Sequence, residues 1–532
     1  MGTKNLNSAT NLITFTRASG GTALRKISYG NELVTNGNGT TTAGWTTSGA
    51  AIFTSDGSEF FVGRNGSGVT QGARQAGILT TGKVYKVTAD IISLTNTFSI
   101  YMGAGTVEAE AKFTVVGLGQ VRYVTATGAD LFIQATAAGG ATATIDNISV
   151  KEVLYDQPDG TLQLFNSPAN VPRIEYDATG AVKGLLIEEA RTNLVTYSNN
   201  LTGTGWLNTL NSNTANAGVS PDGTSNANKV VPTVSSGVHY TYKTLNFTNA
   251  DHSFSVYVAS AGYGFATICA GTTHNNNYYA VVIDLSNGTQ TALYSSATHS
   301  KTVTVEPVGS FYRVTISGDG EKYYVVGASD TGTYTPSNYG FKSFQGDGTS
   351  GILVYGAQAE AGAFPTSYIP TTGSTATRAR DLAEIPTSAF GHNNDHGSLV
   401  IDVLTPVADQ FTPIAYFNTS SFYNSRGFVK SNTNSTSLGP HYVLTTYDGA
   451  STKIQLGTQT QAEYTKLGLS YGDNESGVKD GGTVLSGTSR YPNPTRLYLG
   501  GRDNGYQSQC WIKSIQYYPR RLTNTQLQEL TT

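Results

Sequence analysis

The sequence has only two cysteines, Cys269 and Cys510, among 532 residues. They lie in different proposed modules, so a disulfide framework is excluded and two isolated, buried thiols are expected. No stretch approaches the ~20 consecutive apolar residues of a membrane-spanning helix. Residues 1–15 also lack the apolar run of a signal peptide. We therefore expect no membrane insertion.

Charged residues are few, at 13%, and the formal net charge is −3. Because the chain has no basic stripe, a nucleic-acid partner is not expected. Glycine (61) and tyrosine (32) are abundant, and threonine, serine and asparagine are frequent. Glycine and asparagine suit turns, whereas threonine, valine and tyrosine suit a pleated, half-buried surface. The composition therefore predicts an all-β chain, and its length predicts roughly three or four domains.

One pattern occurs twice in the chain. Residues 31–45 and residues 193–206 each contain a Leu-Val-Thr triplet, an Asn-rich turn and a Gly-Trp pair that ends at Trp45 or Trp206. Each copy closes on an apolar strand with acidic residues, at 143–153 and at 352–362. The duplication predicts tandem β-sandwich modules. A Trp that follows a turn and leads into a sandwich is more often part of the core than a sugar platform, so we expect both indoles in equivalent core positions.

We divide the chain into five parts on these patterns. They are an N-terminal attachment segment (1–29), a first sandwich module (30–153), a linker that packs on its neighbours (154–192), a second module that duplicates the first (193–372) and a C-terminal sandwich (373–532). In the last part, GVKDGGTVL (477–485) predicts a hairpin around Asp480-Gly481. Very little helix is expected, apart from a short terminal helix that Thr523 and Gln526 begin with a capping box.

Four segments resemble a recurrent part of bacteriophage virion proteins, which occurs in tail fibres, tail spikes and head-associated fibres. They are TFTRAS (14–19), NVPRIEYD (170–177), GLLIEEARTNL (184–194) and GAQAEAGAFPTSYIPTTGSTATRARD (356–381). The first two usually lie close together in that pattern, so the first module is interpreted as an insertion. The two modules resemble carbohydrate-binding-module-like jelly rolls. The last region resembles laminin-G-like, concanavalin-type sandwiches, so the expected fold is tandem jelly-roll-like sandwiches plus a concanavalin-like one.

The resemblance implies a virion location and a host-surface glycan as ligand. It also implies that the N-terminal segment binds other virion proteins and that the chain self-associates, with a trimer favoured. The leading hypothesis is a fibre or appendage adhesin that is not an enzyme. One alternative is a purely architectural virion component without a ligand. The second alternative is a polysaccharide depolymerase, which ranks last because no short-period β-helical repeat is present.

Two motifs suggest chemistry but favour a structural interpretation. GILTTGK (77–83) matches a phosphate loop up to its lysine, but Val84 replaces the Ser or Thr and a strand pattern follows, so a hairpin turn is predicted. HNNDH (392–396) lies between glycines, which favours a polar loop over a metal-binding helix face. No catalytic residue and no cofactor is assigned. Modules of these types often hold a structural calcium ion, but no D-x-D-x-D-G loop is present and no metal is assigned.

The best candidates for glycan contact are aromatic residues in polar loops of the C-terminal sandwich. Tyr423 and Tyr506 would stack on sugar rings, while Arg426 and Asp503 would hydrogen-bond hydroxyl groups. A further aromatic loop, HNNNYY, spans 274–279. An interface or a solvated loop is the alternative for HNNNYY and for the two loops that hold the four candidate residues, NTSSFYNSRG (418–427) and GRDNGYQSQ (501–509).

Overall fold

The computed structural model describes residues 12–532 except for 66–70, 104–108, 137–139, 246–250, 274–276, 296–300, 320–321, 336–337, 406–411, 419–423, 432–440, 449–450, 459–462, 489–492 and 502–508. The chain is nearly all β, as the composition predicted. It forms two compact units. One comprises the described residues up to Arg25, Leu164–Ala217 and Ala227–Thr532, and the other comprises Lys26–Gln163 and Gly218–Asn226.

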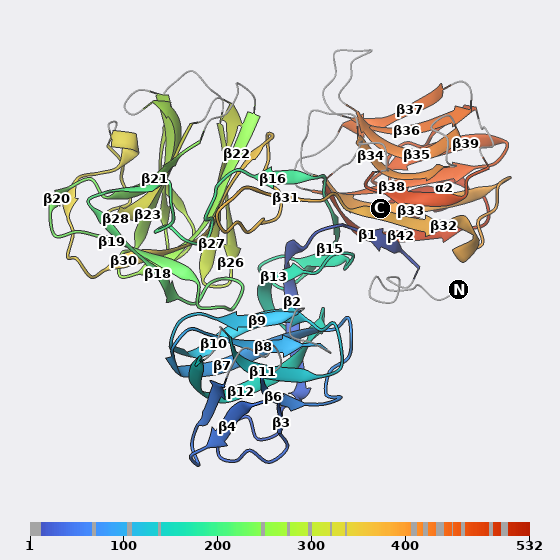
Figure 1. Cartoon of the computed structure of the whole chain (residues 1–532). Helices are drawn as coiled ribbons and strands as arrows, with labels where there is room; N and C mark the ends of the chain where they lie inside the picture. The colour runs from blue at the N-terminus through green and yellow to red at the C-terminus, as the bar shows by residue number, and fades with distance from the viewer. Residues whose placement is uncertain are drawn as a thin grey trace. The chain divides into compact units, whose positions relative to one another are not determined.

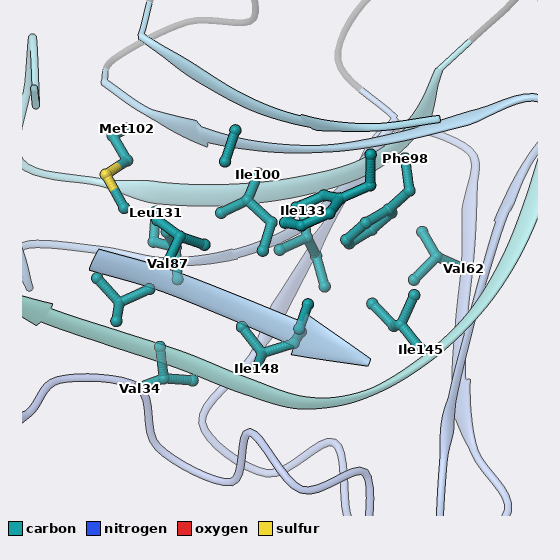
Figure 2. Packing of buried hydrophobic residues seen from close by; sticks show 14 of the residues in the cluster. Val34, Val62, Val87, Phe98, Ile100, Met102, Leu131, Ile133, Ile145 and Ile148 are labelled. Atoms are coloured by element: carbon teal, nitrogen blue, oxygen red, sulfur yellow. The ribbon is translucent and has the colours of Figure 1, made fainter. Parts of the chain in front are cut away.

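The first module consists of two antiparallel sheets. The larger contains β10 (Gly117–Thr125), β7 (Val84–Leu94), β12 (Thr142–Tyr155), β2 (Gly21–Glu32) and β13 (Thr161–Ser167), with β4 (Ala51–Ser55) and β5 (Phe60–Arg64) at one side. The smaller contains β3 (Thr46–Ser48), β6 (Gly72–Gln75), β11 (Leu131–Thr136), β8 (Thr97–Met102) and β9 (Glu110–Phe113). Burial alternates along β7, as a strand with one buried face requires. Figure 2 shows the apolar cluster of this module, which includes Ile133 from the smaller sheet and Ile145 from the larger.

The second module also consists of two antiparallel sheets (Figure 1). One contains β17 (Trp206–Thr209), β21 (Tyr240–Thr244), β28 (Tyr323–Ser329), β23 (Phe265–Thr273), β24 (Asn277–Asp284) and β25 (Gln290–Ser295). The other contains β18 (Asn211–Gly218), β19 (Ala227–Pro232), β30 (Gly351–Ala361), β22 (Asp251–Ala261), β27 (Phe311–Asp319) and β26 (Lys301–Val308). A two-stranded sheet, β20 (Ser236–Gly237) and β29 (Phe344–Gln345), and a short 3₁₀ turn, η1 (Asn338–Gly340), complete it.

The two tryptophans of the repeat make equivalent contacts, as predicted, but the expected buried core position is confirmed only for Trp206. The Trp45 indole Nε1 donates to the carbonyl of Asn36 at 3.3 Å, and the Trp206 Nε1 donates to that of Tyr197 at 3.2 Å. Both acceptor residues have a left-handed backbone, with φ of 51° and 56°. Trp206 is only 7% exposed, whereas Trp45 is partly buried against the core of its module.

A second pair of equivalent contacts ties the start of each module to its last strand. The Glu32 carboxylate accepts from the backbone amide of Val150 at 2.9 Å, and the Asn193 side-chain oxygen accepts from that of Ala359 at 3.1 Å. The polar side chain before each Leu-Val-Thr triplet therefore accepts a hydrogen bond from the last strand of its module in both copies. Val150 in β12 corresponds to Ala359 in β30.

The C-terminal sandwich has two sheets of seven strands each. One contains β1 (Thr14–Thr16), β32 (Leu382–Pro386), β41 (Arg496–Leu499), β34 (Thr412–Asn418), β35 (Asn424–Ser431), β36 (His441–Asp448) and β37 (Ser451–Thr458). The other contains β14 (Arg173–Tyr176), β15 (Val182–Ile187), β42 (Cys510–Tyr518), β33 (Gly397–Leu404), β38 (Tyr464–Tyr471), β39 (Asn474–Lys479) and β40 (Leu485–Thr488). A 3₁₀ turn, η2 (Thr387–Ala389), and helix α2 (Asn524–Thr531) complete it, and β16 (Arg191–Asn193) pairs with β31 (Ala376–Arg378).

The boundaries of the predicted attachment segment and linker need correction. β1, from the segment 1–29, pairs with β32, and β15, from the linker 154–192, pairs with β42, so both regions supply strands to the C-terminal sandwich. β2 starts at Gly21 and belongs to a sheet of the first module. Short apolar runs cannot bury their side chains alone, and they do so by extending the edge of an existing sheet. β1 and β14 belong to one sandwich although the first module separates them in sequence, which supports its interpretation as an insertion.

Several local predictions are confirmed. Helix α2 has the capping box, with Gln526 N donating to Thr523 Oγ1 at 3.2 Å and Thr523 N donating to Gln526 Oε1 at 3.1 Å. β39 and β40 form the hairpin, and Asp480 and Gly481 after β39 both have positive φ. Cys269 and Cys510 are both buried, and neither forms a disulfide bond.

None of the helices in the described part of the chain is long and apolar enough to cross a membrane.

Candidate functional site

Five charged side chains meet in the interior of the larger unit. They are Arg17, Arg173, Glu188, Arg378 and Asp381, and each side chain is at most 1% exposed. Asp381 binds Arg17 at 3.0 Å and Arg173 at 2.5 Å through its two oxygens. Glu188 Oε2 lies 2.9 Å from Arg173 and 3.5 Å from Arg378. We call this group the arginine clasp.

The clasp also binds the backbone of the segments that supply it. Arg17 Nη2 donates to the carbonyl of Pro168 at 2.8 Å, and Arg378 Nη2 donates to that of Glu189 at 2.6 Å. Glu188 accepts from both the backbone N–H and the hydroxyl of Ser367, at 2.7 and 2.6 Å. All four segments that resemble phage virion proteins therefore converge on one buried group. Strands too short to fold alone are held together by charge-assisted hydrogen bonds.

Both carboxylates of the clasp are paired with guanidinium groups, and the three arginines leave one positive charge in excess. Burial by itself would raise the pKa of Glu188, but Arg378 and Arg173 outweigh it and lower that pKa to about 2. Burial and the nearby positive charge of Arg173 lower the pKa of Arg17 to about 10, so this guanidinium stays protonated at neutral pH. Because the group is sealed from water, it acts as a structural joint and offers no open surface to a ligand.

The lowered pKa of Glu188 makes the stability of this unit dependent on pH. A carboxyl whose pKa falls from 4.5 unfolded to about 2 folded contributes its full stabilisation above pH 4.5 and loses it as the pH falls towards 2. The contribution amounts to about 3 kcal/mol. We expect Glu188→Gln to be less stable than the wild type in urea at neutral pH and the difference to shrink at about pH 2. A difference that is the same at both pH values would contradict this assignment.

A second feature is a layer of tyrosines on the face of the β21–β28–β23–β24–β25 sheet that lies opposite the core. Along β28, Tyr324 belongs to the core cluster, whereas Tyr323 belongs to the opposite face, as strand alternation requires. We call this layer the tyrosine face. Its members are Tyr240, Tyr242, Tyr278, Tyr294 and Tyr323 from the strands, and Tyr334 and Tyr339 from the segment after β28.

The rings of the tyrosine face touch one another in a series. The ring centroids of Tyr278 and Tyr294 are 4.8 Å apart, and those of Tyr294 and Tyr334 are 5.4 Å apart. Tyr240 contacts Tyr339 edge to face at 5.6 Å. Tyr278 is buried and Tyr294 is partly buried, whereas Tyr334 is 37% exposed, so the series reaches from the sheet to solvent.

The hydroxyls of Tyr278 and Tyr339 in the tyrosine face are uncharged. Burial raises the pKa of the Tyr278 and Tyr339 hydroxyls further above their ordinary value. These phenols therefore stay protonated at any physiological pH. A neutral tyrosine presents an apolar ring with a polar tip, which allows it to stack on a sugar ring and hydrogen-bond a hydroxyl.

Of the four residues predicted to bind a glycan, the structure describes only Arg426, and its position does not support the prediction. Arg426 lies in β35 and is 0% exposed. Its Nε donates to Glu475 Oε1 at 2.6 Å, and its guanidinium lies 4.1 Å from the centre of the Tyr471 ring. This side chain cannot hydrogen-bond a surface sugar as predicted. Tyr423, Asp503 and Tyr506 lie outside the described residues.

The burial of Arg426 has a signal in the sequence. In β35, Arg426 and Phe428 are two residues apart and both are fully buried. Side chains at i and i+2 share one face of a strand. The Asn and Ser residues before Arg426 favoured a loop. The alternation of Arg426 with Phe428 instead indicates a strand with both side chains on its buried face, and the structure has this arrangement.

HNNDH is a loop, as predicted, and GILTTGK is a turn. The predicted hairpin is wrong, because this turn connects β6 of the smaller sheet to β7 of the larger sheet. In GILTTGK, Gly82 N donates to the carbonyl of Ala126 at 2.8 Å, and strand β7 begins directly at Val84, so no helix follows the turn. Burial lowers the pKa of His392 to about 4, and its neutral ring stacks near Tyr517 and Phe417. Within the described ranges, no group of three His, Cys, Asp or Glu side chains could hold a metal ion.

Among the comparisons with known proteins, only the comparison with solved structures found similarity, and that similarity is distant. No protein-family model and no curated protein matches the chain. Among solved structures, Trypanosoma rangeli sialidase is similar over 91% of this chain and 84% of its own, with a TM-score of 0.23 and 10% identity. The same sialidase in complex with 2,3-difluorosialic acid, as a covalent intermediate, is similar over 90% and 83%, with a TM-score of 0.22 and 10% identity.

This comparison corrects the functional prediction from the sequence. The similar structures are those of an enzyme, which contradicts the predictions of a non-enzymatic adhesin and of a chain without catalytic activity. The identity and TM-scores are too low for the reaction or the substrate of the sialidase to be transferred to this chain.

Proposed function

We propose that the protein engages a carbohydrate polymer on the tyrosine face of its second module. The observation that supports this proposal is the series of tyrosine rings in contact, tilted against one another, that ends in the exposed Tyr334. Rigid aromatic side chains provide a large contact area at a low cost in conformational entropy. The accessible end of this series is the exposed Tyr334 beside the partly buried Tyr294, and these two rings could stack on sugar residues of a polymer that lies across the surface.

We also propose a bacteriophage virion as the location, with a host-surface glycan as the polymer. The support is the resemblance of the four segments to phage virion proteins, together with their convergence on the arginine clasp. The further partners that we propose are other virion proteins, bound through the N-terminal segment, and additional copies of this chain, with a trimer favoured. Several copies would strengthen a contact that is weak at each site.

The tyrosine face can be tested by removing its two outermost rings. Each stacked ring contributes on the order of 1 kcal/mol, so Tyr294→Ala combined with Tyr334→Ala should weaken binding to host-cell polysaccharide by roughly tenfold or more. Binding is measured by pull-down on immobilised polysaccharide, and released reducing ends are assayed in the same samples to detect cleavage.

Tyr464→Ala is the matched control, because Tyr464 is similarly exposed, at 36%, but lies in the C-terminal sandwich. Its binding should equal that of the wild type. Unchanged binding by the folded double variant would refute a role of the tyrosine face. A loss of binding in the control as large as in the double variant would refute the assignment to the second module.

A further inference from the structure

Three fully buried side chains at the end of the second module form a compact reactive arrangement. Gln358 and Glu360 lie two residues apart in β30 and therefore share one face of the strand. Thr366 lies in the connection that follows β30. All three residues are 0% exposed. The Glu360 carboxylate bridges the other two, since Thr366 Oγ1 donates to its Oε1 at 2.5 Å and Gln358 Nε2 donates to its Oε2 at 2.8 Å.

Neighbouring groups hold the hydroxyl and the amide in place. The backbone N–H of Ile369 donates to Gln358 Oε1 at 2.6 Å, where it polarises the amide carbonyl and would stabilise negative charge on that oxygen. Thr366 is held from two sides. Its backbone N–H donates to Glu360 Oε2 at 2.8 Å, and its carbonyl accepts from Arg313 Nη2 at 2.7 Å. A nucleophile, a base and a polarised acyl group therefore meet in a site without solvent.

We propose that Thr366 and Gln358 form an intramolecular ester cross-link, with Glu360 as the catalytic residue. Glu360 accepts the proton of the Thr366 hydroxyl, and Oγ1 attacks Cδ of Gln358. The negative charge develops on Oε1, beside the N–H of Ile369. Glu360 then returns the proton to Nε2, the Cδ–Nε2 bond breaks and ammonia leaves. The products are one ester bond and one ammonia molecule, so atoms and charges balance without an oxidant or a further reactant.

The surroundings favour this reaction in two ways. Burial raises the pKa of Glu360, which suits a carboxyl group that first accepts a proton and then returns it. The fold also fixes the reacting groups within one hydrogen-bonded cluster, which replaces an encounter in solution by an intramolecular step. Exclusion of water protects the ester product from hydrolysis.

The module fold does not require an amide and a carboxylate at the positions of Gln358 and Glu360, as the first module shows. Ala359 corresponds to Val150 in the first module, so Gln358 and Glu360 correspond to Ser149 and Lys151. Neither residue provides an amide or a carboxylate. The first module thus closes on an equivalent strand without these groups. The inference is also independent of the proposed function, because it involves no residue of the tyrosine face.

Mass spectrometry of the full-length protein tests the proposal. The cross-link should lower the mass by about 17 Da, the mass of ammonia. The loss should be found in the tryptic peptide 343–378, which contains both reacting residues and no asparagine, so that asparagine chemistry cannot imitate it. Cleavage after Glu360 should leave its two parts joined, and hydroxylamine should separate them. A wild-type peptide of unreduced mass would overturn the proposal.

Three variants show whether a missing cross-link results from the loss of a reacting group or from a disturbed structure. Thr366→Val and Glu360→Gln should each show the full mass, because the first lacks the nucleophile and the second lacks the base. Thr377→Val is the matched control. Thr377 lies in β31, where its hydroxyl contacts that of Thr192 at an exposed position, so this variant should keep the mass loss. A loss that persists in Thr366→Val would also overturn the assignment.

Discussion

Replacement of Arg173 by alanine should lower the free energy of unfolding of the larger unit by about 3–5 kcal/mol. Arg173 contacts both carboxylates of the arginine clasp, at 2.5 Å to Asp381 and 2.9 Å to Glu188. Its removal leaves these two groups buried with less positive charge to compensate them, and a buried carboxylate without compensation is costly. The change also releases the contact of Arg173 with the backbone carbonyl of Thr22, at 2.7 Å. Urea unfolding followed by circular dichroism measures the effect.

The control for Arg173→Ala is a surface arginine of the same unit. Arg496 pairs with Glu384, and its side chain is 47% exposed. An exposed ion pair contributes at most about 1 kcal/mol, so Arg496→Ala should change the unfolding free energy little. Equal losses in the two variants would show that burial of the clasp is not the source of its contribution.

Truncation of Trp206 to alanine should cost about 3–5 kcal/mol as well. The Trp206 indole is 7% exposed, belongs to the core cluster of the second module and donates its Nε1–H to the carbonyl of Tyr197 at 3.2 Å. Lys243 Nζ lies over the ring at 5.3 Å. The variant therefore loses packing, a hydrogen bond and the partner of a buried cation. Calorimetry of the full-length protein measures the shift of the transition.

Leu207→Ala is the control for Trp206→Ala, because the two residues are adjacent in β17 and Leu207 is 51% exposed. It should change stability by no more than about 0.5 kcal/mol. If Trp206→Ala left the transition unchanged and abolished glycan binding instead, the indole would be a sugar platform and the assignment to the core would be wrong.

Local features of this chain were predictable because neighbouring residues determine them. The capping box at Thr523, the turn at Asp480-Gly481 and the turn before Val84 depend on side-chain and backbone geometry within a few residues. The equivalence of Trp45 and Trp206 was predictable because the sequence repeats around them. The prediction for Arg426 was wrong because loop-like composition was given more weight than the strand alternation with Phe428.

By itself, the sequence determined the all-β class, the repeated pattern that ends at Trp45 and Trp206 and the capping box of the terminal helix. Only the tertiary structure decided that the N-terminal segment and the linker complete the C-terminal sandwich. It alone decided that Arg17, Glu188 and Asp381 meet. Arg17 and Asp381 are 364 positions apart in sequence, and no local pattern specifies a pairing over that distance. Such a contact exists because a buried charge needs a partner, and only the folded chain brings that partner within reach.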